Sequence, residues 1–306
     1  MKIIETLDTI NLNRPTVVAL GNFDGVHIGH QQILREAVRE ARKANASAVC
    51  FTFSNHTRNN VRLICTEQEK LAILEALGID IVVNVEFTPE IRDLSAEAFV
   101  REILHERLRA VGACCGFNYR FGAKASGTAE LLSELGSRYG ITVYRQEAVS
   151  LGETVVSSSY IRELIEAGEL EKVSACLGRN YAMNGTVRHG NHLGSTIGFP
   201  TANILYDPSM MAPPNGVYYT YATLNGVKYP AVTNIGVKPT IGEGYAKSVE
   251  THIFGLDQPL YGQEILVEFL VWERPEMKFD GIDALKAQIA KDYALAKAYH
   301  TSRGDL

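Results

Sequence analysis

Long apolar runs, C-x-x-C cysteine pairs and basic blocks are all missing from this chain of 306 residues. No stretch approaches the ~20 consecutive apolar residues that a membrane span needs. The N-terminal segment lacks the layout of a secretory signal. The five cysteines are odd in number and form no C-x-x-C pair, which argues against a disulfide framework and against a zinc site. We therefore expect a cytoplasmic protein that is not attached to a membrane.

The charge balance also excludes some partners. The formal net charge is −5 and no cluster of lysine and arginine stands out, so general binding to nucleic acid is not expected. Apolar residues make up 46% of the chain and charged residues 21%, which is typical of a globular protein. The length leaves room for two domains, each with its own core. The sequence does not give the oligomeric state, and a monomer is compatible with it.

Apolar strands alternate with amphipathic helices over the first half of the chain. The expected strands span residues 16–20, 47–53, 79–87, 110–115 and 141–149. Thr66, Ser95 and Thr128 are expected to cap the N-termini of three intervening helices. Strands that alternate with helices predict a parallel sheet, which binds its ligands at the carboxyl ends of its strands.

The pattern changes near residue 183. Residues 157–182 favour helix, whereas short β-rich runs separated by glycine turns follow them. Asn225-Gly226 lies between two of these runs and predicts a type I′ hairpin. Several short strands in succession predict an antiparallel barrel or sandwich. A last helix is expected after Asp280, its predicted N-cap.

One string between the first long strand and its helix carries the strongest chemical signal. It reads Gly21-Asn22-Phe23-Asp24-Gly25-Val26-His27-Ile28-Gly29-His30. Gly21, Gly25 and Gly29 let the backbone approach a ligand closely, and a helix N-terminus offers N–H groups to an anion. His27 and His30 can face the same phosphates and stabilise charge as an α-phosphate is attacked. The string predicts a nucleoside triphosphate site, and a glycine-rich turn with two surface histidines is the alternative.

A second glycine-rich string, residues 185–203, lies in the β-rich half. Gly190 and Gly198 suit a segment that closes over phosphates. Thr201 and Asn203 are two apart on an extended segment, so their hydroxyl and amide oxygens can share one hard cation, for which Mg²⁺ is the expected ion. A turn that simply joins two strands is the alternative interpretation.

Both strings resemble parts of the bacterial bifunctional riboflavin kinase/FMN adenylyltransferase (FAD synthetase) family. The opening string is similar to the family's start. Residues 116–122 resemble its G-x-D-F-R-F-G motif, 156–162 its I-S-S-T-x-I-R motif, 194–203 its riboflavin kinase site and 249–253 the segment with its catalytic glutamate. The matches occur in order over nearly the whole chain.

The resemblance implies an α/β fold class with two domains. Residues 1–183 are expected to form a Rossmann-like nucleotidyltransferase domain with a parallel sheet, which would act as the FMN adenylyltransferase. Residues 184–306 are expected to form an antiparallel β-barrel riboflavin kinase domain with a terminal helix. The implied reactions phosphorylate riboflavin to FMN with MgATP and adenylylate FMN to FAD with release of pyrophosphate.

The resemblance also implies roles for individual residues. Catalysis falls to His27, His30 and Arg162 in the first half, and to Glu250, as general base on the riboflavin 5′-hydroxyl, in the second. The residues expected to bind ATP are Gly21, Phe23, Asp24, Gly25, Gly29, Ser157, Ser158, Ser159, Gly190, Gly198 and Thr201. The residues expected to bind flavin are Asn118, Tyr119, Arg120, Phe121, Asn215 and Arg274. Thr201 and Asn203 are the expected Mg²⁺ ligands.

Several positions depart from the family pattern. The T-F-x-P-H-P motif appears as residues 52–57 without either proline, Asn118 replaces an aspartate, and Ser159 replaces a threonine. Leu193 and Ser195 stand where arginine is common. The altered residues 55–57 and Asn118 keep one alternative open, a monofunctional riboflavin kinase with an impaired or redox-selective adenylyltransferase domain. Two further alternatives are a non-catalytic flavin or nucleotide sensor and adenylylation of another phosphate acceptor.

Overall fold

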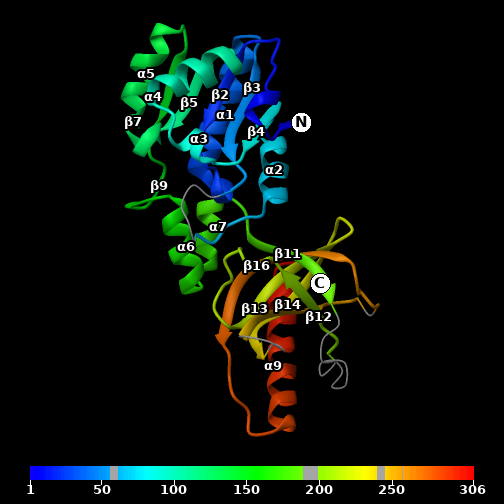
Figure 1. Ribbon diagram of the computed structural model, residues 1–306. Helices are drawn as coiled ribbons and strands as arrows, with labels where there is room; N and C mark the ends of the chain where they lie inside the picture. The colour runs from blue at the N-terminus through cyan, green and yellow to red at the C-terminus, as the bar shows by residue number, and fades with distance from the viewer. Residues whose placement is uncertain (56–60, 189–198, 240–244, 257) are drawn as a thin grey trace. The chain divides into compact units, whose positions relative to one another are not determined.

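The computed structural model describes residues 1–55, 61–188, 199–239, 245–256 and 258–306. The chain forms two compact units, Met1–Ser158 and Ser159–Leu306 (Figure 1). These units are defined by packing alone, so the division of function near residue 183 stays a prediction. Within the described residues, no helix is both long and apolar enough to cross a membrane.

The first unit is built on a six-stranded sheet with the strand order β1-β4-β3-β2-β5-β8. Its strands are β1 (Lys2–Ile4), β2 (Thr16–Leu20), β3 (Ser47–Phe53), β4 (Ile81–Val85), β5 (Ala110–Gly116) and β8 (Thr142–Gln146). Every neighbouring pair is parallel, which confirms the predicted parallel sheet. Because β2 lies between β3 and β5, the strand order reverses there, and parallel sheets bind ligands at such a point.

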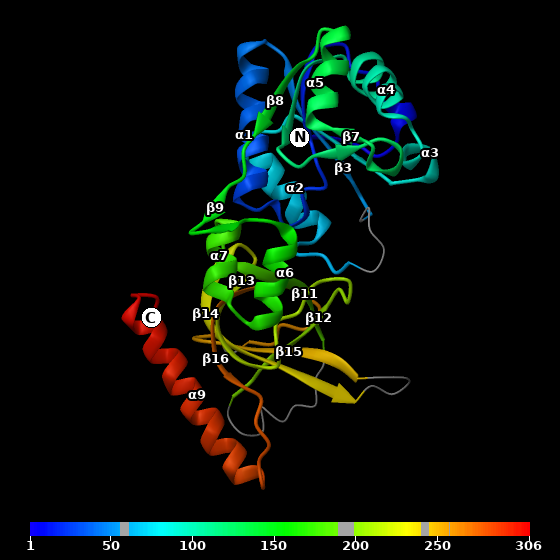
Figure 2. The ribbon, with the colours of Figure 1, turned by 90° about the vertical axis from the view of Figure 1, so that its left-hand side faces the viewer.

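Helices cover both faces of this sheet (Figure 2). On one face lie α1 (Ile28–Lys43) and α2 (Glu67–Ala76), whose Leu34 and Leu74 join a core with Ala19 and Val82. On the other face lie α4 (Ala96–Ala98), the π-helix η3 (Phe99–Arg107) that continues it, and α5 (Ala129–Arg138). Shorter elements are η1 (Leu7–Thr9), η2 (Asp24–Val26), α3 (Pro89–Arg92), β6 (Arg120–Phe121), η4 (Ala123–Ala125), β7 (Gly127–Thr128), β9 (Ser150–Leu151) and β10 (Thr154–Val155).

The three predicted helix caps are confirmed. The side chains of Thr66, Ser95 and Thr128 each accept a hydrogen bond from the backbone N–H three residues later, at 3.2, 3.0 and 3.2 Å. Each bond satisfies an amide that has no partner within its own helix. The starts of α2, α4 and α5 are therefore fixed by local sequence.

The second unit contains a closed antiparallel barrel with the strand order β11-β12-β15-β14-β13-β16. Its strands are β11 (Tyr181–Arg188), β12 (Ala202–Tyr206), β13 (Gly216–Leu224), β14 (Val227–Pro239), β15 (Tyr245–Ile253) and β16 (Glu264–Pro275). Asn225 and Gly226 have φ angles of 48° and 79°, as the predicted type I′ turn between β13 and β14 requires. Inside the barrel, the hydroxyls of Thr220, Thr233 and Thr251 form a hydrogen-bonded chain with spacings of 2.8 and 2.9 Å.

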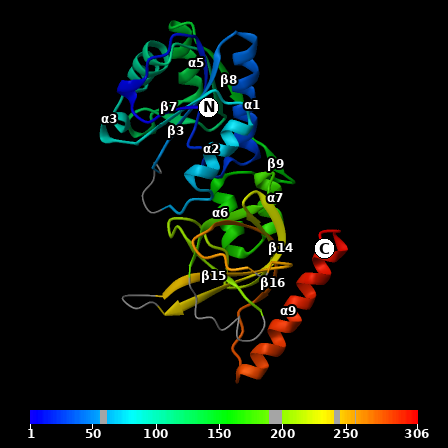
Figure 3. The same ribbon diagram turned by 90° about the vertical axis from the view of Figure 1, so that its right-hand side faces the viewer.

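In the sequence of this unit, helices precede the barrel strands and another helix follows them. The helical segment predicted over 157–182 is two helices, α6 (Ser158–Ala167) and α7 (Leu170–Leu177). The terminal helix α9 (Ile282–Ser302) runs along the outside of the barrel (Figure 3), where Ala296 and Tyr293 pack with Tyr219 and Phe254. The prediction that Asp280 caps α9 was wrong. Gly281 is the N-cap, and its carbonyl accepts the first helical bond, from Leu285.

Candidate active sites

The glycine–histidine string, residues 21–30, leaves β2 at its carboxyl end and forms a strained turn before α1. Phe23, Gly25 and Val26 have φ angles of 50°, 75° and 39°. A positive φ is costly for any non-glycine residue and most of all for a β-branched one. Phe23 and Val26 are fully buried, so packing holds them in place. A Cβ on Gly25 would lie 2.8 Å from Cγ2 of Ile64, so the turn has room only for glycine there.

Neighbouring segments fasten this turn. The Thr52 hydroxyl on β3 donates to the Asn22 carbonyl at 2.9 Å. The amide of Ile64 donates to Oδ1 of Asp24 at 3.1 Å, and the Ser158 hydroxyl donates to the Asp24 carbonyl at 3.0 Å. Asp24 and Ser158 were predicted to bind ATP. In the structure they hold the turn that presents the histidines, and their contact with ATP stays a prediction.

His27 and His30 are brought together as the sequence predicted. Their rings are stacked, with centroids 3.6 Å apart and an interplanar angle of 19°. Nδ1 of His27 accepts the backbone N–H of His30 at 3.3 Å, so the side chain of His27 caps α1. An accepting Nδ1 places the proton of neutral His27 on Nε2. A Cβ on Gly29 would lie 3.2 Å from Cε1 of His27, so glycine leaves room for the ring.

Both imidazoles are neutral near pH 7. Burial lowers the pKa of His27 to about 4. Burial, and then the neighbouring His27, hold the pKa of His30 well below its usual value. The site thus offers N–H donors at the positive end of α1, and the charge of a bound phosphate would raise both pKa values.

The predicted flavin residues of the first unit follow β5. Asn118 and Arg120 are exposed and available to a ligand. Tyr119 stacks on Phe121 with centroids 5.7 Å apart, and burial raises the pKa of the Tyr119 hydroxyl. Phe121 is buried and packs on Phe99 of η3 with ring centroids 5.5 Å apart, so it is part of the hydrophobic core of this unit. Direct contacts of these four residues with flavin stay predictions.

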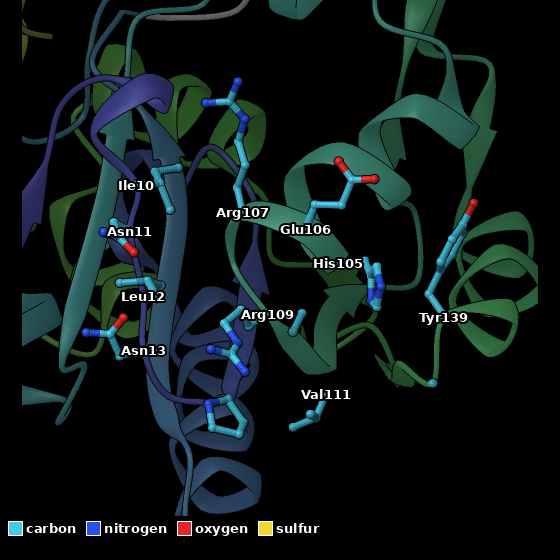
Figure 4. Close-up of a pocket in the computed structure, with 13 residues that line it drawn as sticks. Ile10, Asn11, Leu12, Asn13, His105, Glu106, Arg107, Arg109, Val111 and Tyr139 are labelled. Carbon is cyan, nitrogen blue, oxygen red and sulfur yellow. The ribbon is translucent and has the colours of Figure 1, made fainter.

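A cavity of about 700 Å³ lies at the opposite edge of the same sheet (Figure 4). Residues from the segments 10–15, 105–111 and 139–140 line it, and they lie near the amino ends of β2, β5 and β8. None of the predicted site residues is among them. Because parallel sheets bind ligands at their carboxyl edge, the glycine–histidine string is the candidate site of this unit.

In the second unit, strand register places the predicted kinase residues in one row on the outside of the barrel. Asn203 of β12 is paired with Glu250 of β15, and Glu250 is paired with Asn234 of β14. The row continues through Val217 of β13 to Arg274 of β16. Directly paired residues point to the same side of a sheet. Thr251, the residue after Glu250 on β15, points into the barrel, so Glu250 points outward. We call these five paired residues the Glu250 row.

Thr201 reaches the same place from just before β12. Its hydroxyl lies 3.5 Å from Oε2 of Glu250, at the outer limit of a hydrogen bond. The ring of His252 bonds through Nδ1 to the carbonyl of Pro200 at 2.7 Å, and this bond fixes the peptide that leads into Thr201. Hydroxyl, amide and carboxylate oxygens from Thr201, Asn203 and Glu250 therefore gather together. Oxygen donors of this kind suit a hard cation such as Mg²⁺.

A smaller cavity of about 230 Å³ adjoins Thr201 at the rim of the barrel. Thr251, Ile253, Leu260 and Tyr261 help to line it. Sites for whole ligands are typically about 300–1,000 Å³. This cavity therefore has room for one part of a nucleotide beside Thr201.

Arg274 and Asn215, the predicted flavin residues of this unit, bind to protein groups. Nε and Nη2 of Arg274 donate to the carboxylate of Asp292 on α9 at 3.0 and 2.5 Å. Nδ2 of Asn215 donates to Oε2 of Glu276 at 3.0 Å. Arg274, which is itself the last member of the Glu250 row, and Asn215 thus brace this end of the barrel. Their contact with flavin stays a prediction.

Comparison with known proteins covers both units. A family model described as FAD synthetase matches residues 9–160, and one described as riboflavin kinase matches residues 177–300. A protein of Listeria monocytogenes is 33% identical over 99% of this chain and 97% of its own length. One from Haemophilus influenzae is 34% identical over 99% of this chain and 100% of its own length. Both are named bifunctional riboflavin kinase/FMN adenylyltransferase.

The chain belongs to this family. The predictions of a parallel-sheet fold joined to a β-barrel and of an enzyme that makes flavin nucleotides are confirmed. ATP, riboflavin, FMN and FAD fit the family as substrates or products. A crystal structure titled as a macrolide-efflux protein from Streptococcus pneumoniae has a TM-score of 0.88 with 29% identity, over 96% of this chain and 98% of that one.

Family membership does not establish what every predicted site residue contacts. Gly190 and Gly198 lie outside the described residues, as do His56 and Thr57 of the altered T-F-x-P-H-P motif. Arg162 lies on α6, in the second unit. Its contact with phosphates held by the first unit therefore stays a prediction, and so do the contacts expected of the residues at the start of α6, Ser157 and Ser159.

Sequence reasoning missed the residues that brace these sites. Asp292 completes the ion pair of Arg274, and Asn234 flanks Glu250 by register. A carboxylate on the apolar face of the last helix, in step with Leu285 and Ile289, was the available signal for Asp292. Only the strand register places Asn234 beside Glu250.

Proposed function

We propose that the two sites divide the two reactions of the family between them. Riboflavin would be phosphorylated at the Glu250 row, and the resulting FMN would be adenylylated at the glycine–histidine string. The observation that supports this division most strongly is that each constellation is assembled within its own compact unit: stacked His27 and His30 in the first, and Thr201, Asn203 and Glu250 in the second.

In the kinase reaction, Glu250 accepts the proton of the ribityl 5′-hydroxyl while that oxygen attacks the γ-phosphorus of ATP and ADP leaves. An alcohol needs such a positioned base because its own pKa is high. Thr201 and Asn203 would hold Mg²⁺, which supplies charge neutralisation on the phosphates when bound. The 3.5 Å separation between Thr201 and Glu250 keeps the base next to the ion site.

In the adenylyl transfer, a phosphate oxygen of FMN attacks the α-phosphorus of ATP and pyrophosphate leaves. N–H groups of His27, His30 and the first turn of α1 stabilise the charge that develops on the α-phosphate. The serines at 157–159 and Arg162 would hold the β- and γ-phosphates, for which the planar fork of arginine is suited. Positioning and charge stabilisation suffice, and no covalent intermediate is required.

The proposed enzyme acts in the cytoplasm on small molecules, with no nucleic-acid or membrane partner. Its net charge of −5 and the absence of a basic block in the sequence support this. A monomer would suffice, because each site is built from residues of one chain.

The direct test is to incubate the protein with riboflavin and MgATP, in air and under reductant, and to separate riboflavin, FMN and FAD by chromatography. FAD in either condition is the expected result, and a difference between the conditions would indicate a preference for one redox form of FMN. Accumulation of FMN alone would favour the monofunctional kinase. No product would favour the sensor.

A further inference from the structure

One buried asparagine in the first unit, outside the two sites described above, has an amide oxygen without a hydrogen-bond partner among the described residues. Asn84 lies in β4 and is 2% exposed. Its Nδ2 donates to Oε1 of Glu67 at the start of α2. Its Oδ1 is buried and has no hydrogen-bond partner among the residues that the structure describes. Because an ionised carboxylate only accepts hydrogen bonds, the nitrogen must face Glu67 and the oxygen is the atom left over.

An acceptor buried in this way is costly. A buried polar group without a partner loses the hydrogen bond that it makes to water in the unfolded chain and gains none in return. The rest of β4 is the apolar run Ile81-Val82-Val83, followed by Val85, so a valine at position 84 would suit the strand better. Native proteins satisfy nearly all buried polar groups. A ligand that donates a hydrogen bond would explain why an asparagine stands here.

Asn84 lies at the same edge of the sheet as the histidines. It is directly paired with Thr52 of β3, whose hydroxyl donates to the carbonyl of Asn22 in the glycine–histidine string. Cys50 and Val82, two residues earlier on the same strands, belong to the core beneath α1 and α2, so Asn84 and Thr52 face those helices. Asn84 is therefore two strands from β2, on the face where α1 begins.

A second unpartnered atom occurs at this edge. Nδ1 of His30, in the glycine–histidine string, is also buried without a hydrogen-bond partner in the described part of the chain. By contrast, the neighbouring Lys70 of α2, which is 8% exposed, donates to the carbonyl of Phe53 at 3.1 Å. Local packing thus does not prevent polar groups from finding partners here. The two exceptions, His30 and Asn84, both lie at the carboxyl edge of the sheet, on the face that α1 and α2 cover.

We propose that Asn84 is a further substrate-binding residue of the adenylyl-transfer site. Its Oδ1 accepts a hydrogen bond from an N–H group on a substrate heterocycle, either the imide of the flavin ring or the amino group of adenine. A phosphate cannot fill this role, because it too is an acceptor. Asn84 lies at the carboxyl edge of the sheet, as the histidines do, and its neighbour Thr52 holds the glycine–histidine string. This inference rests on the proposed adenylyl transfer.

The test compares the steady-state kinetics of FAD formation by the wild type and by Asn84→Val. Valine removes the acceptor and matches the neighbouring strand residues. We expect the KM for one substrate, FMN or ATP, to rise about tenfold with kcat within about twofold, which corresponds to one neutral hydrogen bond. The rate of riboflavin phosphorylation should not change, and the melting temperature should stay the same or rise because a buried unsatisfied atom is gone.

Val85→Ala is the matched control, since it truncates the next residue, which points to the opposite face of the sheet. It should lower the melting temperature and leave both KM values unchanged. If Asn84→Val does not fold, Asn84→Thr keeps a side-chain oxygen in a β-branched residue and should give a smaller rise in the same KM. Thermal protection by FMN and by ATP measures binding without turnover and should weaken for the same substrate.

The outcomes separate the two sources of the donor. A higher KM for FMN alone supports the flavin imide, and an N3-methylated flavin should then bind wild type and Asn84→Val alike. A higher KM for ATP alone supports the adenine amino group. Unchanged KM values and unchanged thermal protection in Asn84→Val, in a protein whose wild type makes FAD, would overturn the inference. A wild type that makes no FAD from FMN and ATP would instead overturn the proposed function.

Discussion

His27 and His30 come from one short string at the end of one strand, whereas Asn203, Glu250 and Arg274 come from three barrel strands that are far apart in the sequence. The first site is shaped by its own backbone, with a strained turn and a helix N-terminus next to each other in the chain. The second site exists only when the barrel has closed in the correct register. It also depends on α9, because Asp292 holds Arg274.

This difference predicts how each site fails. A substitution in the glycine–histidine string should act on the chemistry close to it. A substitution that loosens α9 or the barrel should act on several residues of the Glu250 row together. The variants below test this contrast, beginning with the largest expected effect.

Asp292→Asn should destabilise the barrel by about 3–5 kcal/mol, because it leaves the largely buried guanidinium of Arg274 without its counter-ion. The single tryptophan of the chain, Trp272, lies in β16, so denaturant unfolding followed by its fluorescence reports on the barrel. Riboflavin phosphorylation should fail at a lower temperature than adenylylation. Asp283→Asn, in the exposed first turn of the same helix, is the control and should change little.

A double substitution of Arg274 and Asp292 tests whether Arg274 only braces the barrel or also contacts flavin. The double variant Arg274→Met with Asp292→Leu should recover most of the stability, since well-packed apolar residues can replace a buried ion pair. Recovery of the KM for riboflavin as well would show that Arg274 only braces the site. A KM that stays high in a stable double variant would show that Arg274 contacts flavin, as the sequence predicted.

Replacements of His27 separate its chemistry from its role as helix cap. Both His27→Ala and His27→Asn should slow adenylyl transfer by about 10²–10³-fold, because each removes a donor at the α-phosphate. Only alanine should also lower stability, by about 1 kcal/mol, since asparagine can still cap α1. Riboflavin phosphorylation should be unaffected in both. Equal loss of stability in the two variants would contradict the capping role, and His105→Ala, at the opposite edge of the sheet, is the control.

The buried histidines also predict a pH dependence of stability. The unfolded chain binds a proton on His27 below about pH 6.5, whereas burial keeps the folded imidazole neutral down to a pKa of about 4. The unfolded state then holds more protons, so stability is intact above pH 6.5 and falls by up to roughly 3 kcal/mol as the pH drops to 4. The lowered pKa of His30 acts in the same direction. Urea unfolding followed by circular dichroism, repeated at several pH values, gives the free energy of unfolding as a function of pH. This free energy should fall less steeply between pH 6.5 and 4 in His27→Asn than in the wild type. An unchanged pH dependence would contradict the buried, neutral imidazole.

The same contrast explains how much could be predicted from sequence. The parallel sheet, the helix caps and the stacked histidines follow from local patterns, because periodicity, capping residues and a contiguous motif act over a few residues. The cap of α9 was misplaced by one residue, since both Asp280 and Gly281 are acceptable there. The polar residue in β4, Asn84, was visible as an asparagine within an apolar run but has meaning only once its partners are known.

The barrel site was only partly predictable. The sequence motifs marked Thr201, Asn203 and Glu250, yet they did not reveal that Asn234 stands next to Glu250 or that Arg274 faces Asp292. Strand register and the docking of a helix decide these contacts, and both depend on residues distributed over the whole second unit. These contacts therefore cannot be predicted from local sequence patterns.

The central claim, that one chain holds two separable sites, is tested most directly by mixing two single-site variants. Glu250→Gln with riboflavin and MgATP should form almost no FMN, and His30→Ala should accumulate FMN without FAD. Mixed together, the two proteins should produce FAD, because FMN released by one is adenylylated by the other. If Glu250→Gln also fails to convert added FMN to FAD, or if the mixture makes no FAD, the two sites are not separable and the account is contradicted.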